Sequence, residues 1–66
     1  DNIVVKFKTI NNNDKIYIEN DLMDLNGIKS FRVSVESNSI FIQYDSSNFN
    51  FNYIYGIFDK WNLIPL

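Results

Sequence analysis

Residues 25–44, LNGIKSFRVSVESNSIFIQY, contain the pattern that decides the fold. Apolar and polar residues alternate over residues 31–36, and in residues 40–44 Ile40, Ile42 and Tyr44 alternate with Phe41 and Gln43. Alternation with a period of two is typical of a strand with one buried face. Only the turn-forming residues 37–39 separate the two runs, so we expect them to pair as an antiparallel hairpin.

Helical spacing flanks this hairpin on both sides. Ile18, Leu22 and Leu25 stand at i, i+4 and i+7, which predicts one apolar helix stripe. Gly27 closes that helix, because glycine suits the left-handed position after a helix end. A second stripe follows the hairpin, at i, i+3, i+4 and i+7, and consists of Ile54, Ile57, Phe58 and Trp61. Asn62 is suited to end this second helix.

The two ends of the chain predict further strands. Ile3, Val5 and Phe7 alternate with polar residues and Val4, while residues 63–66 predict a short last strand, where Pro65 is tolerable only at an edge. The order strand, helix, strand, strand, helix, strand is the split βαβ arrangement. We therefore predict an α+β ferredoxin-like βαββαβ sandwich, with a four-stranded antiparallel sheet and two helices on one face.

Composition limits the class of protein. The 66 residues are enough for one domain, residues 1–66, whose 45% apolar and 17% aromatic content favours folding by packing alone. The chain has no Cys, which fits a reducing compartment, and we expect it to be cytoplasmic. A net charge of −2 argues against a general phosphate-backbone binder, and no apolar run is long enough for a membrane span. Because the chain begins at Asp1, an excised domain and a processed product are both expected origins.

Several segments together resemble heavy-metal-associated domains. Residues 25–35 are similar to the family segment L-x-G-V-x-S-x-x-V, and residues 40–45 are similar to the family's third strand. The pattern C-x-x-x-I-x-x-x-L of the first helix and the pattern I-x-x-x-I-x-x-x-G-Y of the second are matched at Ile18, Leu22, Ile54, Phe58 and Asn62-Leu63. The spacing holds without a gap from Asp14 to Leu63. The resemblance implies the ferredoxin-like fold and a protein related to metal transport.

The chain departs from the family at the residues that bind metal. Family members carry G-M-T-C-x-x-C after the first strand, whereas residues 8–14 here read KTINNND. In this alignment Ile10 replaces the buried Met and Asp14 replaces the second Cys. The first Cys falls on Asn11 when counted from the helix and on Asn12 when counted from the first strand.

Soft metals such as Cu(I) require thiolate ligands, and the chain contains no Cys, no His and one Met. We therefore predict a degenerate member that binds no metal and no other cofactor; the residues of the thiol-free loop are Asn11, Asn12, Asn13 and Asp14. A calcium site would need six to eight oxygen ligands, so capping of the first helix is the favoured role of this loop.

The sequence contains no candidate catalytic residues. There is no His, no Cys and no phosphate-binding loop, and no carboxylate pair is placed for acid–base work. We expect a non-enzymatic binding module with a protein partner, acting as an interaction or regulatory domain. One alternative is a metal-linked role that uses Asn and Asp ligands or ligands from a partner.

The remaining candidates are surface residues. Phe41, Arg32 and Gln43 alternate out of the core face, and this open face suggests as a further alternative weak binding of single-stranded nucleic acid. The RNP1 pattern of RNA-recognition domains is missing from the third strand, so this alternative is less favoured. The second helix carries more aromatic residues than one stripe can bury, which adds Tyr55 to the predicted interaction residues.

Overall fold

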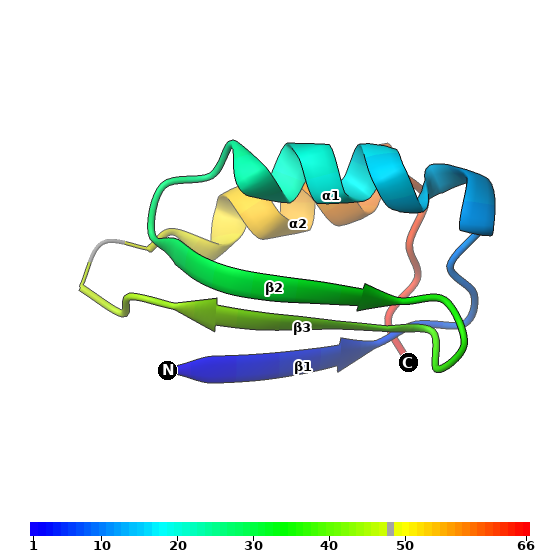
Figure 1. Ribbon diagram of the computed structural model, residues 1–66, viewed down its shortest axis with the longest axis horizontal. Coiled ribbons are helices and arrows are strands. Elements are labelled where there is room, and N and C mark those ends of the chain that lie inside the picture. Colours follow the sequence, from blue (N-terminus) through cyan, green and yellow to red (C-terminus); the bar gives the residue numbers. More distant parts are fainter. Residues whose placement is uncertain (48) are drawn as a thin grey trace.

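The computed structural model describes residues 1–47 and 49–66 as a sheet covered on one face by two helices (Figure 1). The elements follow in the order β1 (Asn2–Lys6), a 3₁₀ turn η1 (Asn12–Asp14), α1 (Lys15–Met23), β2 (Ile28–Ser34), β3 (Ser39–Tyr44) and α2 (Phe51–Lys60). The strand order in the sheet is β1-β3-β2, and both pairings are antiparallel. The predicted ferredoxin-like architecture is confirmed.

The prediction of a fourth strand at residues 63–66 is wrong. In the part of the chain described, the sheet has three strands, and the C-terminal segment adds a single antiparallel bridge between Phe7 and Pro65. The Lys8 N–H donates to the Ile64 carbonyl at 3.0 Å, and the Leu66 N–H donates to the Lys6 carbonyl at 2.9 Å. Pro65 has no N–H and lies between these two bonds. The segment therefore lies where a fourth strand is expected, beside β1, without extending as a ladder.

The core consists of the apolar positions that the alternation and the helical spacing select. Ile18, Leu22 and Ile40 are fully buried, and Ile42 is almost so. The rings of Phe7 and Phe58 meet edge to face, with their centroids 4.8 Å apart. Burial of each such side chain contributes about 1.5–3 kcal/mol, so this core is the main source of stability in a chain without disulfides.

The ends of the elements differ in detail from the prediction. Helix α1 ends at Met23, so Leu25 lies in the following turn, half-buried against the core. Gly27 takes the expected positive φ of 90°, and β2 starts directly after it, three residues earlier than the alternation indicates. Asn62 ends the second helix with a φ of 55°, as predicted, since Asn tolerates the left-handed conformation.

A polar cluster joins the two helices on their outer side. Asp21 Oδ2 accepts a hydrogen bond from the Trp61 indole at 2.8 Å and forms an ion pair with Lys60 Nζ at 3.1 Å. The Trp61 bond, aided by Lys60 and opposed by desolvation, lowers the pKa of Asp21 below its usual value. Tyr17 stacks on the same Trp61 ring, with the centroids 5.8 Å apart. The two helices are thus held together by specific contacts above the core.

Candidate functional site

The loop between β1 and α1 is anchored by the β2–β3 turn. The Phe7 N–H donates to the Asn38 carbonyl at 2.8 Å, and the Ile10 N–H donates to Asn38 Oδ1 at 2.9 Å. Ile10 is only 2% exposed, which places it in the core at the position that the resemblance assigns to a buried Met. Asn38 can approach both amides because it adopts a left-handed φ of 50°. The loop is therefore fixed at its apolar base.

The polar tip of the loop uses its side chains to begin the helix. Asn11 Oδ1 accepts from the Asn13 N–H at 2.9 Å, and the Asn11 carbonyl accepts from the Asp14 N–H at 3.0 Å. Asp14 precedes α1 and makes no side-chain capping bond. Asn11 is therefore the residue that caps this turn.

The loop offers few ligands for a metal ion. Asn12 and Asn13 are exposed, and Asp14 contributes the single carboxylate of residues 11–14. Among residues 1–47 and 49–66, no three His, Cys, Asp or Glu side chains are grouped in a way that could hold a metal ion. A hard cation would have to be held by one carboxylate and neutral amide oxygens.

Three of the four predicted interaction residues share the open face of the sheet. The strand register places Phe41 directly between Val4 of β1 and Arg32 of β2. Gln43 follows two positions along β3, and the Ser30 hydroxyl donates to its Oε1 at 3.0 Å. Val4 is 57% exposed, Arg32 and Gln43 are exposed, and Phe41 is half-buried. The face combines a small apolar centre with a polar border.

The fourth predicted residue, Tyr55, lies in the other layer of the molecule. It belongs to α2, and its ring is 6.4 Å from that of Phe51 and 6.3 Å from that of Phe58. Its ring contacts belong to an aromatic group that continues to Phe49 and to Tyr44 at the end of β3. The structure thus brings Arg32, Phe41 and Gln43 together and leaves Tyr55 apart from them.

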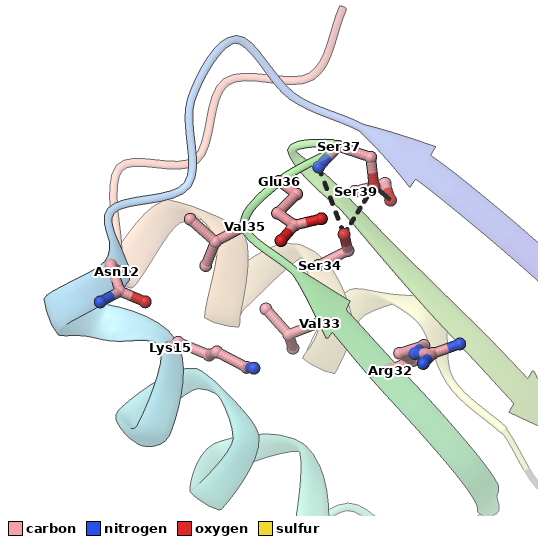
Figure 2. A pocket seen from close by; sticks show the side chains of 9 residues that line it. All are labelled: Asn12, Lys15, Arg32, Val33, Ser34, Val35, Glu36, Ser37 and Ser39. Carbon is pink, nitrogen blue, oxygen red and sulfur yellow. Dashed lines mark hydrogen bonds between the residues drawn. The ribbon is translucent and has the colours of Figure 1, made fainter.

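The structure adds a hollow that sequence reasoning missed. It measures about 550 Å³ and lies beside β2, near the hairpin turn (Figure 2). Lys15 of α1 and Arg32 of β2 are among the residues that line it. At the hairpin end, the Ser37 hydroxyl donates to Ser34 Oγ at 2.7 Å (Figure 2). Lys15 carries no signal in the sequence that distinguishes it from any other first-turn helix residue, because its position depends on which strand α1 covers.

Comparison with known proteins shows that this chain has the same fold as a solved structure. No protein-family model matches the sequence, and the search of curated proteins finds no match either. Among solved structures, a CopZ metallochaperone superposes with a TM-score of 0.82 and 16% identity, covering 100% of each chain. Along the described residues, no helix is both long and apolar enough to cross a membrane.

Proposed function

We propose that this chain is a non-catalytic module of the heavy-metal-associated type that lacks the thiolate metal site and acts by protein contact. The observation that carries the proposal is the loop between β1 and α1. Its base keeps the buried apolar anchor Ile10, while its tip contains Asn and Asp in place of thiols. The full-length likeness to a metallochaperone fold supports placing this loop where that type of module holds metal.

The chemistry of the loop disfavours soft metals. Cu(I) and Zn²⁺ sites in small domains are built from thiolate or imidazole groups, and the chain has neither. The Asn11 side chain, one of the two candidates for the first ligand position, already accepts a backbone hydrogen bond. The same loop that would serve metal transfer thus serves here to start a helix.

The proposal extends to the setting of the domain. Residues 1–66 form one such domain, which works in the cytoplasm as an interaction or regulatory part of a protein related to metal transport. The interaction residues proposed are Arg32, Phe41 and Gln43 on the open sheet face, with Tyr55 as a separate exposed ring. Each function of a domain depends on its own site on the surface and not on the fold as a whole. Loss of the metal site therefore does not remove a separate surface that contacts proteins.

An NMR titration of the ¹⁵N-labelled chain with Cu(I), Zn²⁺ and Ca²⁺ tests this proposal. We expect the amide signals of residues 11–14 to stay in place with all three ions. Saturable shifts of these signals with Cu(I) or Zn²⁺ would contradict the proposal that the thiolate metal site has been lost without replacement. Saturable shifts with Ca²⁺ alone would support instead a metal-linked role based on Asn and Asp ligands.

A further inference from the structure

The proposed function does not identify the partner protein. The outer edge of β2 indicates which kind of segment such a partner would offer. Within residues 1–47 and 49–66, β2 pairs with β3 on one side and with no strand on the other. Helix α1 runs alongside β2 on the covered face of the sheet (Figure 1). The edge and the helix together resemble the strand-and-helix grooves that accept an added peptide strand.

The register shows which backbone groups this edge presents. Asp1 and Tyr44 exchange both of their backbone bonds, at 2.9 and 3.0 Å, so they form a hydrogen-bonded pair of the β1–β3 ladder. Because such pairs alternate in an antiparallel sheet, Phe41 directs its N–H and C=O to Arg32 of β2. Phe31 and Val33, on either side of Arg32, therefore direct theirs to the outer edge, where half-buried Phe31 is more accessible than Val33, which is 4% exposed.

Hollows along the same edge leave space for another strand. One of about 390 Å³ is lined by the first half of β2, up to Phe31, and the hollow of about 550 Å³ is lined by the second half, from Arg32 onward. Met23 of α1 lines the first and Lys15 lines the second. An extended segment laid along β2 would pass both hollows and run beside the outward N–H and C=O groups of Phe31 and Val33.

The charge of the groove is opposite in sign to that of the whole chain. Its lining residues include Lys15, Lys29 and Arg32 against Glu36, a balance of three cations to one anion, whereas the chain carries −2. Figure 2 shows Lys15 on the helix side of β2 and Arg32 on the opposite side. Successive side chains of a strand point to opposite faces, so acidic residues of an added strand could meet both cations.

We infer that the β2 edge, walled by α1, accepts an extended acidic segment of a partner protein as an additional strand. This inference rests on the proposed function and places the protein contact at the β2 edge, which shares Arg32 with the open-face residues proposed above. A second copy is a poorer occupant, since antiparallel pairing of two β2 strands would bring Lys29 and Arg32 of both copies together. The β1 edge is a poorer site, because the C-terminal segment already bonds to Lys6 and Lys8 there.

The test uses the ¹⁵N-labelled chain and an end-blocked octapeptide with Glu at its four central positions and Thr at the others, so that Glu side chains point to both faces of the added strand. We expect saturable shifts of the Phe31 and Val33 amides and slower hydrogen exchange at both, with the exchange of Arg32 unchanged. A matched octapeptide of Thr and Lys should leave the spectrum in place. The double variant Lys15→Glu, Arg32→Glu should weaken binding by about tenfold or more, while Lys6→Glu on β1 should change it less than about twofold.

Three results would overturn the inference. These are the lack of saturable shifts up to about 5 mM peptide, equal binding of the Lys peptide, and shifts centred on Val4 and Phe41 instead of on the edge. Should the double variant fail to give a dispersed amide spectrum, Arg32→Gln provides the same comparison with a smaller expected loss. None of these results bears on the metal titration, so failure of the inference and failure of the proposed function are distinguishable.

Discussion

The core beneath the helices and the loop after β1 differ in how tightly their side chains are packed. In the core, Ile18, Leu22 and Ile40 are wholly buried and are held by packing alone. In the loop, Ile10 is buried while Asn12 and Asn13 are exposed and free of packing constraints. The fold therefore depends on the loop's base and not on its tip, so the chemistry of the tip can change while the architecture is kept.

The largest expected effect comes from breaking the core. Leu22→Ala should lower the free energy of unfolding by about 2–5 kcal/mol, because it removes packed atoms and leaves a cavity. Urea denaturation followed by circular dichroism measures the loss. The neighbouring Met23 is 69% exposed, and Met23→Ala should cost less than about 0.5 kcal/mol. Equal losses in the two variants would contradict the assignment of the core.

The next effect concerns the tie between the loop's base and the hairpin turn. Asn38→Ala should cost about 1–3 kcal/mol, since it leaves the Ile10 N–H without its acceptor and places Ala at a φ of 50°. Asn38→Gly keeps the backbone conformation accessible and removes only the acceptor, so it should cost less than Asn38→Ala. If neither variant shifts the urea midpoint, the anchoring role of Asn38 is wrong.

The tip of the loop should respond more weakly. Asn11→Ala should cost about 1 kcal/mol, the usual value for a lost capping bond. Asp14→Ala is the matched control, because Asp14 makes no side-chain capping bond and its loss should have little effect. Thermal denaturation of both variants at neutral pH compares them. The reverse order of effects would show that Asp14 is the cap.

The smallest effect is the pH dependence of the helix–helix cluster. Trp61 and Lys60 hold the pKa of Asp21 below its usual value of 3.8. The carboxylate therefore contributes stability that is present above pH 3.8 and is lost as the pH falls through the lowered pKa. Asp21→Asn should reduce stability at pH 7 by less than about 1 kcal/mol, given the solvent exposure of Lys60. The difference from the unmodified chain should shrink as the pH falls from 3.8 through the lowered pKa of Asp21; a difference that stays constant over that range would point to packing.

The hairpin and both helices could be predicted because each has a strong local period. In residues 40–44, Ile40, Ile42 and Tyr44 alternate with Phe41 and Gln43, and Ile40 and Ile42 are buried as that period requires. The prediction of a last strand was wrong because residues 63–66 meet β1 at a single bridge between Phe7 and Pro65, and local alternation does not show how far a pairing extends. The early end of α1 was missed because Leu25 continues the apolar spacing from within a turn.

The candidate site was predictable only where it follows from residue type. The lack of thiols in residues 8–14 can be read directly from the sequence. The bond from Ile10 to Asn38 joins residues 28 positions apart, and nothing local marks it. The groove beside β2 likewise depends on how the elements pack, which decides that Lys15 and Arg32 line the same hollow and that Phe41 and Tyr55 lie in different layers.

A Cu(I) competition titration tests the central claim, that the loop's tip and not the fold excludes soft metal. It compares the unmodified chain with the variant Asn11→Cys, Asp14→Cys, which restores two thiols at the C-x-x-C spacing; Asn12→Cys, Asp14→Cys checks the other alignment. We expect the unmodified chain to leave a chromogenic Cu(I) chelator saturated, and one of the two double variants to withdraw one Cu(I) per chain. Withdrawal of Cu(I) by the unmodified chain with similar affinity would contradict the account.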